Sequence, residues 1–498
     1  MSSIFDLLNE AVATSPDKTA LIDRDGELTY RQLGELTVTH AAALTREGVA
    51  PSDRVVLTAS PDRHTVALIF ATARIGAVAV PVHLDLTATQ LEQVAANCEA
   101  SVVIVDDENT SCAVKSVVWR RDAWLTALDV HAAADEPYAT GSTDLALLLY
   151  TSGTTSAPKG VMCPHDAVLR ATASVGQVLR YRPDDVVLLR LPLAFDYGLY
   201  QVFLTVAARG TVLLAGRDMD TSLVDLIVGH RVTVAPLVPS LAQMLLMLTA
   251  GRPVESGLRL FTNTGARMGE SLWRELQTVF PAAEYASMYG MTECKRISIL
   301  RPDELVTRPT SVGRAIPGNS IRIVDEAGEE LPAGSIGTIV VRGATMMAGY
   351  WRMPLDRQRQ YVAYDGGLEL HTGDQGWLDD EGYLYFSGRD DDVIKRQGIR
   401  VSLTEIEAAA ERLDGVEEAV ALKPGDDGRL VLCVVGDLPE KAITQALMES
   451  LDIARRPNLI LHVDSIPLTK NGKPDRVALG AVVAERRGTA VGRAPAGA

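Results

Sequence analysis

The sequence of 498 residues lacks a long apolar run, has few cysteines and carries a deficit of positive charge. No apolar stretch approaches the ~18 residues that a membrane span requires, so we expect no membrane association. The five cysteines show neither paired nor metal-ligand spacing, which argues against a disulfide framework or a zinc site and favours a reducing cytoplasm. The net charge of −16 argues against nucleic acid or an anionic membrane as the main partner.

The N-terminus also lacks a basic region followed by an apolar core, so it does not resemble a signal peptide. Its apolar residues recur at helical spacing and predict an amphipathic first helix. A hydrophobic content of 47% is ordinary for a chain that forms a core, and the length predicts two or three domains. We therefore expect a soluble, cytoplasmic protein with more than one domain.

Short apolar strands alternate with helical stretches through most of the sequence before residue 311. Residues 102–105 and 186–189 have the pattern of buried strands, and residues 165–180 and 240–250 have the period of helices. This alternation predicts a large N-terminal domain of layered α/β subdomains with largely parallel strands. From about 311 to 388, short alternating strands and Gly/Pro turns predict a β-barrel-like, antiparallel subdomain.

A second change in pattern follows residue 390, and we expect the large domain to span residues 1–390. Residues 391–485 are long enough for a small α+β C-terminal domain. Its expected helices and strands lie near residues 403–413, 416–422, 429–435 and 439–451. The small and polar residues of 486–498 predict a disordered tail.

Residues 147–162 read LLLYTSGTTSAPKGVM, an apolar strand followed by a loop rich in hydroxyl groups. Hydroxyls can contact phosphate oxygens, and glycine lets backbone amides approach them closely. Lys159 adds a positive charge but precedes Gly160, whereas a Walker loop needs Gly-Lys followed by Ser or Thr. The alternative is a Ser/Thr-rich surface turn. The expected phosphate-binding residues are Thr151, Ser152, Gly153, Thr154, Thr155 and Lys159.

This loop resembles, residue for residue, that of the adenylate-forming superfamily, which includes acyl-CoA synthetases, adenylation domains of nonribosomal peptide synthesis, and beetle luciferases. The resemblance runs from about residue 16 to Lys473, with a departure at Ser156, where the family usually has glycine. It implies ATP and Mg²⁺ as cofactors. It also implies that the small C-terminal domain is mobile and acts as a lid.

Residues 287–293 read SMYGMTE and match a second motif of the family. The resemblance implies that Tyr289 offers an aromatic face to adenine, that Thr292 lies near the α-phosphate and the substrate carboxylate, and that Glu293 binds magnesium. A planar ring can stack on a base, and a hard divalent ion prefers a carboxylate oxygen beside the phosphates. A capped turn is the structural alternative for this motif.

Two further segments match nucleotide-binding positions of the family. Gly265, Ala266 and Arg267 follow a strand and resemble a second loop beside adenine; a plain strand-to-helix turn is the alternative. Asp374 is expected to accept hydrogen bonds from both ribose hydroxyls, and Arg389 to reach the ribose or a phosphate. Taken singly, these two residues would fit an Asp turn and a solvated arginine.

The resemblance also gives roles to residues near the domain boundary and the C-terminus. Asp391 matches the hinge on which the small domain turns, and Gly398 matches the position where the pantetheine arm of a thiol acceptor passes. Lys473 matches the catalytic lysine, which bridges the substrate carboxylate and the α-phosphate. Lys470 lies close by and is expected to be only solvated.

The acid pocket is expected at Phe195, Asp196, Tyr197 and Gly198. In amino-acid-activating members, an Asp after Phe binds the substrate ammonium, and a buried carboxylate needs such a cation. However, Tyr197-Gly198 departs from the usual continuation, and an internal partner such as Arg190 would also satisfy Asp196. The residues leave both possibilities open, and we favour an acyl or aryl acid over an amino acid.

The resemblance implies an AMP-forming acid–thiol ligase. ATP and a carboxylic acid give an acyl-adenylate, and a thiol then takes the acyl group. The thiol belongs to coenzyme A or to the phosphopantetheine of a carrier protein that acts in trans. Three alternatives are a stand-alone amino-acid adenylation enzyme that loads a carrier, a ligase that stops at the adenylate, and a non-catalytic adenylate-binding protein.

Overall fold

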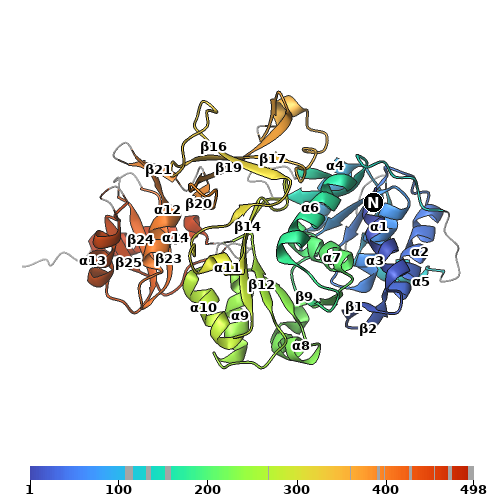
Figure 1. Ribbon diagram of the computed structural model, residues 1–498, viewed down its shortest axis with the longest axis horizontal. Helices are drawn as coiled ribbons and strands as arrows, with labels where there is room; N and C mark the ends of the chain where they lie inside the picture. Colours follow the sequence, from blue (N-terminus) through green and yellow to red (C-terminus); the bar gives the residue numbers. More distant parts are fainter. Residues whose placement is uncertain are drawn as a thin grey trace, which may run out of the picture.

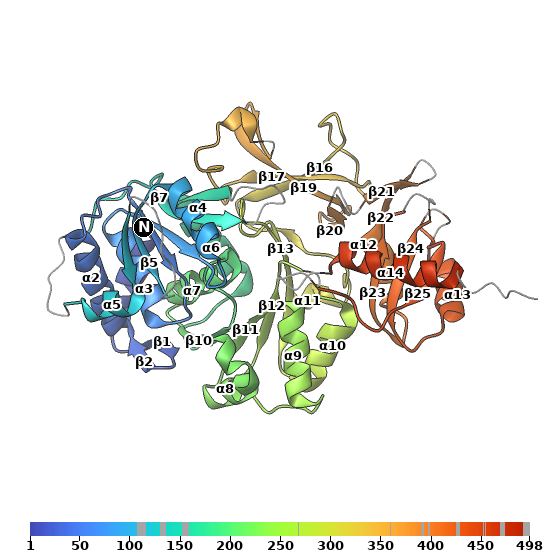
Figure 2. The ribbon, with the colours of Figure 1, turned by 180° about the vertical axis from the view of Figure 1, so that it is seen from behind.

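The structure is a computed structural model that describes most of the chain (Figure 1). The described residues are 1–106, 116–129, 136–151, 159–266, 268–358, 360–389, 393–396, 399–424, 429–451, 453, 455–468 and 474–491. Two α/β subdomains and an antiparallel sheet surround the middle of the molecule, and a smaller unit lies at one end (Figures 1 and 2). This arrangement confirms the predicted α/β class, with a layered N-terminal part and a small C-terminal part.

The N-terminal subdomain contains a sheet in which neighbouring strands are mostly parallel. Its strand order is β6 (Val117–Arg120), β5 (Ala100–Val105), β3 (Arg54–Thr58), β4 (Val78–Val82), β7 (Leu145–Thr151) and β8 (Lys159–Pro164). All residues of β4 are buried, as expected for a parallel strand that helices cover on both faces. The last pair, β7 with β8, is antiparallel, and it places Thr151 opposite Lys159, the described residues on either side of the segment expected to bind phosphate.

The second sheet continues through the middle of the molecule. Its strand order is β15 (Arg314–Ala315), β14 (Ser298–Leu300), β13 (Glu284–Tyr289), β12 (Leu260–Asn263), β11 (Val234–Leu237), β9 (Val186–Leu189), β10 (Thr211–Leu214), β1 (Thr19–Asp23) and β2 (Gly26–Thr29). The pairs from β13 through β1 are parallel, whereas β14 returns antiparallel to β13. That reversal creates the loop from which the site is built.

Helices cover both sheets and share large buried clusters with them. They are α1 (Ile4–Thr14), α2 (Tyr30–Arg46), α3 (Arg63–Arg74), α4 (Ala88–Cys98), α5 (Arg121–Thr126), α6 (His165–Leu179), α7 (Asp196–Ala208), α8 (Leu223–Gly229), α9 (Pro239–Thr249), α10 (Glu270–Val279) and α11 (Pro302–Leu305), with 3₁₀ turns at Arg217–Ser222 and Leu355–Arg357. The predicted amphipathic first helix is confirmed as α1, which the Ser3 side chain caps by accepting from the Phe5 amide. Among the helices that the structure describes, none is long and apolar enough to cross a bilayer.

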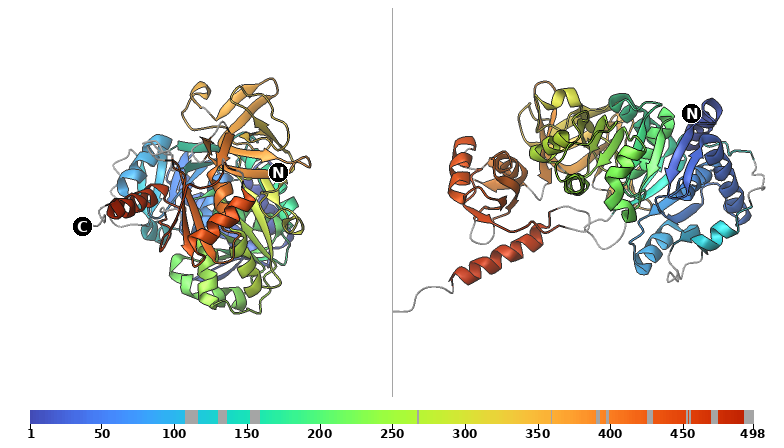
Figure 3. Two further views of the ribbon diagram at one scale, coloured as in Figure 1. Left: turned by 90° about the vertical axis from the view of Figure 1, so that its left-hand side faces the viewer. Right: turned by 90° about the horizontal axis from the view of Figure 1, so that it is seen from below.

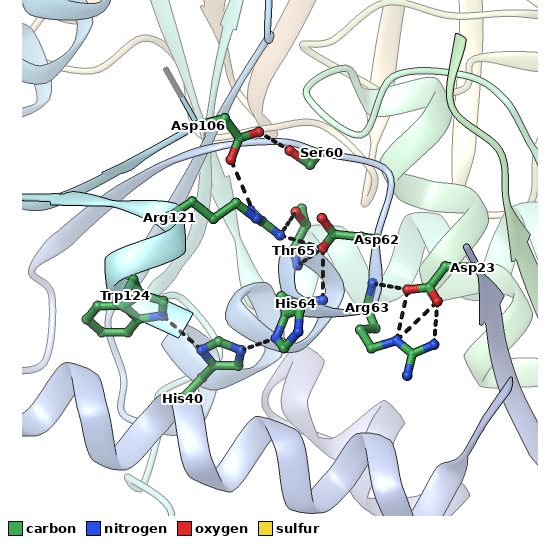
Figure 4. Close-up of polar contacts among 10 residues, drawn as sticks. All are labelled: Asp23, His40, Ser60, Asp62, Arg63, His64, Thr65, Asp106, Arg121 and Trp124. Atoms are coloured by element: carbon green, nitrogen blue, oxygen red, sulfur yellow. Dashed lines mark hydrogen bonds and ion pairs between the residues drawn. The ribbon is translucent and has the colours of Figure 1, made fainter. Parts of the chain in front are cut away.

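A polar network holds the N-terminus of α3 to its neighbours (Figure 4). Asp62 caps the helix by accepting from the amides of His64 and Thr65, and Arg121 of α5 forms an ion pair with the same carboxylate. Trp124 donates to His40 Nδ1 at 3.1 Å, so the His40 Nε2 proton points at His64 Nδ1. Burial lowers the pKa of His40 well below its usual value, so the His40 ring in this chain of hydrogen bonds stays neutral.

The expected antiparallel sheet is present between residues 319 and 389. It contains β16 (Asn319–Val324), β17 (Gly337–Gly343), β19 (Gly367–Leu378), β18 (Tyr361–Tyr364) and β20 (Leu384–Arg389). The long strand β19 pairs with β18 through its first residues and with β20 through its last ones. The pairing of β19 with β20 has a register shift between Gln375 and Gly376.

The C-terminal unit has buried clusters of its own. Its elements are β21 (Val393–Arg396), β22 (Ile399–Ser402), α12 (Leu403–Ala410), β23 (Val416–Leu422), β24 (Val431–Gly436), α13 (Glu440–Ser450), β25 (Leu459–His462) and α14 (Arg476–Val491). Figure 3 shows α14, the last helix of the chain, from one side and from below. This helix runs through Val491 and so extends into residues 486–498, for which the sequence predicts a disordered tail. The predicted boundary at 390/391 and residues 492–498 lie outside the described residues.

Candidate active site

The hairpin between β13 and β14 carries the residues around which the site is arranged. Tyr289 lies opposite Ser298, and the Ile297 amide donates to the Tyr289 carbonyl at 2.8 Å. Residues 290–297 therefore form a tight loop. A Cβ on Gly290 would lie 2.0 Å from the Lys295 carbonyl oxygen, so the loop closes only with glycine there.

A side-chain hydrogen bond joins this hairpin to the antiparallel sheet, between two residues that are expected to bind the nucleotide. Tyr289 donates its hydroxyl to Asp374 Oδ2 at 2.6 Å, and both side chains are buried. The Phe386 ring centroid lies 5.5 Å from that of Tyr289. The residue predicted to face adenine and the residue predicted to bind the ribose thus lie side by side.

Tyr350 connects Lys159, which is expected to bind phosphate, to the same hairpin loop. Tyr350 donates its hydroxyl to Glu293, and Lys159 Nζ lies 5.6 Å from the centroid of the Tyr350 ring. Burial and the nearby Glu293 raise the pKa of Tyr350, so its hydroxyl stays a donor. Sequence reasoning missed Tyr350. It brings the end of the phosphate loop and the expected magnesium ligand together.

Two backbone contacts keep Tyr350 in this place. The Met162 amide donates to the Gly349 carbonyl at 2.8 Å, and the Trp351 amide donates to the Gly160 carbonyl at 2.8 Å. The segment that contains Tyr350 is therefore tied to β8, directly after Lys159.

Several predicted site residues lie outside the described residues. They are Ser152, Gly153, Thr154, Thr155, Arg267, Asp391, Gly398 and Lys473, together with the side chain of Arg389. Thr151 is described and lies opposite Lys159 in the β7–β8 pair. Gly265 follows β12 with a φ of +83°, a conformation that favours glycine, and Ala266 comes next. The roles of all these residues stay predictions.

The described residues on either side of the segment that contains Lys473 are held by contacts with other residues. Leu468 and Pro474 form an isolated β-bridge, so the two ends of the segment meet. Arg476 begins α14 and contacts Glu407 of α12 at 2.6 Å, where Glu407 also accepts from the Ala421 amide at 2.8 Å. The described residues that follow Lys473 are thus held to the C-terminal unit by an ion pair whose carboxylate is buried.

Asp196 has a cationic partner within the protein, and this partner is not Arg190. Arg296 Nη1 lies 3.1 Å from Asp196 Oδ2, and the Thr292 hydroxyl donates to Oδ1 at 3.4 Å. Arg190 instead binds Asp220 at 2.8 Å. The expectation that Arg190 could satisfy Asp196 is therefore corrected. The true partner comes from the hairpin loop, 100 residues further along the chain.

The other expected pocket residues surround Asp196. Phe195 is 42% exposed, and its ring stacks on His83 with centroids 5.4 Å apart. Tyr197 is buried and donates its hydroxyl to the Thr262 carbonyl at 2.7 Å. Arg296 Cζ lies 4.8 Å from the centroid of the Tyr197 ring. A stacked aromatic pair therefore precedes the carboxylate, and a buried tyrosine follows it.

Gly198 is explained by the packing of α7. A Cβ at this position would lie 2.3 Å from the Pro192 carbonyl oxygen and 2.9 Å from that of Leu191. Both atoms belong to the backbone, which cannot yield as a flexible side chain does. The helix approaches the preceding segment closely enough to require glycine at this position.

We predict that Gly198→Ala lowers the free energy of unfolding by about 1–3 kcal/mol, because the added methyl overpacks this contact. The matched control is Gly176→Ala in α6, where the nearest atom to a new Cβ is Leu204 Cδ2 at 3.7 Å. Alanine at Gly176 is expected to stabilise the protein by roughly 0.5–1 kcal/mol. Denaturant melts of both variants measure the difference, and equal stabilities would contradict the packing argument.

The donor set around Glu293 suits magnesium. Among the described residues, no group of three or more His, Cys, Asp or Glu side chains could hold a metal ion by itself. Mg²⁺ usually keeps several waters and takes one or two carboxylates together with substrate phosphates. Glu293 would supply such a carboxylate, and the ion would offset the charge of the phosphates.

Comparisons with known proteins identify the family of the chain. The family model described as AMP-binding enzyme matches residues 8–351. Phenyloxazoline synthase MbtB of Mycobacterium tuberculosis is 30% identical over 486 residues, which cover 94% of this chain and 34% of MbtB. The chain thus spans about a third of that relative.

Solved structures give the same result. VinN in complex with L-aspartate is 36% identical, with a TM-score of 0.72, over 78% of this chain and 98% of VinN. ATP-bound MatB from Rhodopseudomonas palustris is 27% identical, with a TM-score of 0.81, over 97% of this chain and 98% of MatB. From the motifs, the geometry and the matched family model, we conclude that the chain belongs to the AMP-binding enzyme family, within the adenylate-forming superfamily.

Proposed function

We propose that the protein uses ATP to convert a carboxylic acid into an acyl-adenylate and pyrophosphate, and then transfers the acyl group to a thiol. The observation that carries this proposal is the pair of tyrosine contacts in the site. Tyr350 brings Lys159 and Glu293 together, and Tyr289 binds Asp374. A cation, a metal-binding carboxylate and a ribose acceptor around one loop are what ATP recognition requires. MatB, the structural relative with bound ATP, supports the same assignment.

The acid is proposed to be an amino acid. The complex of VinN with L-aspartate supports this choice, and so does the position of Asp196 after Phe195. A second candidate is the acyl or aryl acid favoured by the sequence. The ion pair between Arg296 and Asp196 supports it, because the carboxylate is already neutralised without a substrate ammonium.

The acceptor is proposed to be a phosphopantetheine thiol, which coenzyme A and a carrier protein both present. A swing of the C-terminal unit about Asp391 would withdraw Lys473 after adenylation and bring Gly398 to the thiol path. One cleft could in this way serve two different transition states in turn, with the motion acting as a gate. Asp391, Gly398 and Lys473 lie outside the described residues.

A pyrophosphate-release screen across acid classes, run with and without coenzyme A, tests the proposal. We expect ATP-dependent release with one acid class, and either an acyl-CoA product or an acyl-adenylate that persists until a carrier protein is supplied. A protein that releases no pyrophosphate with any acid contradicts the proposed activity. A protein that forms the adenylate but no thioester with either acceptor retains only the first step.

A further inference from the structure

The hairpin loop carries a buried cation that pairs with no carboxylate of the described residues. Lys295 is 1% exposed and follows Glu293 by two residues in the hairpin loop. Its Nζ contacts Cys163 Sγ at 3.4 Å and lies 5.2 Å from the centroid of the Tyr200 ring. Among the described residues, no carboxylate oxygen lies within 4.0 Å of this nitrogen. An unpaired buried ammonium is costly, so its presence calls for an anionic ligand.

The groups around Lys295 do not supply that anion. Burial raises the pKa of the Cys163 thiol, which therefore stays neutral beside the ammonium. Burial also raises the pKa of Tyr200 well above its usual value, and the buried Tyr200 hydroxyl has no hydrogen-bond partner among the described residues. Two donors, an ammonium and a phenol, thus share this place without a charged acceptor.

The adjacent residue adds a second cation. Arg296 is 5% exposed and forms an ion pair with Asp196, so the charges of these two side chains offset each other. Glu293, the other acid of the loop, binds Tyr350 on the phosphate side. Of the two cations in this loop, only Arg296 has a carboxylate within ion-pair distance among the described residues. A substrate ammonium at Asp196 would compete with Arg296 for that carboxylate, and both cations could then bind an anion of the substrate.

The position of Lys295 in the loop is itself unusual. Its φ of +53° lies in the left-handed region, which side chains other than glycine rarely adopt. Backbone strain of this kind persists where the surrounding structure imposes it, often at a binding site. The loop is held by the contact between Gly290 and the Lys295 carbonyl.

We propose that Lys295 and Arg296 bind a second carboxylate of the substrate, so that the activated acid is a short amino dicarboxylic acid of about the size of aspartate. This inference rests on the proposed function and names its substrate class. The ammonium would lie at Asp196, the second carboxylate at Lys295 and Arg296, and the reacting carboxylate would face ATP. Because Arg296 lies 3.1 Å from Asp196, the two substrate charges must be only a few bonds apart.

The first test compares substrates of the unmodified protein in acid-dependent pyrophosphate exchange. We expect the kcat/KM for L-aspartate to exceed those for L-asparagine and 2-aminobutyrate by about 10²-fold or more, since neutral side chains leave Lys295 unpaired. Succinate, which lacks the ammonium, is expected to be poor as well. Equal rates with aspartate and any of these three acids would overturn the inference, although the proposed activity would stand.

The second test uses Lys295→Met, which keeps the length of the side chain and removes its charge. We expect the KM for L-aspartate to rise by about 10²-fold while exchange with L-asparagine changes little, so that the preference is lost. The melting temperature is expected not to fall, because a buried charge is replaced by an apolar group. Cys163→Ala is the matched control, which removes the sulfur contact and retains the preference for aspartate.

Three results would count against the inference. A Lys295→Met variant that retains the preference for aspartate overturns it. So does one that melts at a lower temperature and loses exchange with all acids equally, because that describes a structural lysine. If the unmodified protein supports exchange with no acid of any class, the proposed function fails, and the inference fails with it.

Discussion

The Lys473→Ala variant is expected to lose acid-dependent pyrophosphate exchange by about 10²–10³-fold or more. An ammonium that bridges the acid and the α-phosphate neutralises both partners as the carboxylate attacks phosphorus. Alanine removes this charge without changing Tyr289 and Asp374, which are expected to contact the nucleotide. ATP binding, measured by equilibrium titration in the absence of acid, should therefore change less than a few-fold.

Lys470→Ala is the matched control, because both lysines lie in the same segment of the sequence, PLTKNGKPDR. We expect this variant to exchange pyrophosphate at nearly the normal rate. The base of the segment is held by Arg476 and Glu407, so neither alanine should disturb the C-terminal unit. Normal exchange in Lys473→Ala, or equal losses in both variants, would refute the assignment of the catalytic lysine.

The parts of the fold that the sequence predicts well are those with a local signal. The β-α alternation predicts buried parallel strands, and β9 (Val186–Leu189) agrees with the expected residues 186–189. The amphipathic spacing of α1 likewise depends only on neighbouring residues. The end of α14 is less predictable, because small residues in a terminal segment suit both a helix and a disordered tail.

The site shows the same division between local and distant information. Short motifs identify Asp374 and Glu293, since each motif is a continuous run of residues. The partners Arg296 and Tyr350 are brought in by the hairpin and by the pairing of β8 with the segment around Gly349. No spacing in the sequence shows that Asp196 meets Arg296 rather than Arg190. The identity of the cation beside Asp196 therefore needed the three-dimensional structure.

The Glu293→Gln variant is expected to lower kcat/KM for adenylation by at least about 10²-fold and to need a higher Mg²⁺ concentration for half-maximal rate. Glutamine is nearly isosteric and still accepts from the Tyr350 hydroxyl, but it carries no charge for a divalent ion. A Mg²⁺ titration of the exchange rate at saturating ATP measures both effects.

The control is Tyr350→Phe, which removes the hydroxyl that binds Glu293 and keeps the aromatic face beside Lys159. We expect a loss of about 10-fold or less, because the carboxylate is then less well oriented but still charged. If Tyr350→Phe were as impaired as Glu293→Gln and both had the normal Mg²⁺ dependence, Glu293 would act through the tyrosine and not through a metal ion. If only Glu293→Gln shifts the Mg²⁺ requirement, the carboxylate is the protein's magnesium ligand, and the loop that carries it connects the phosphate side of the site to the acid pocket.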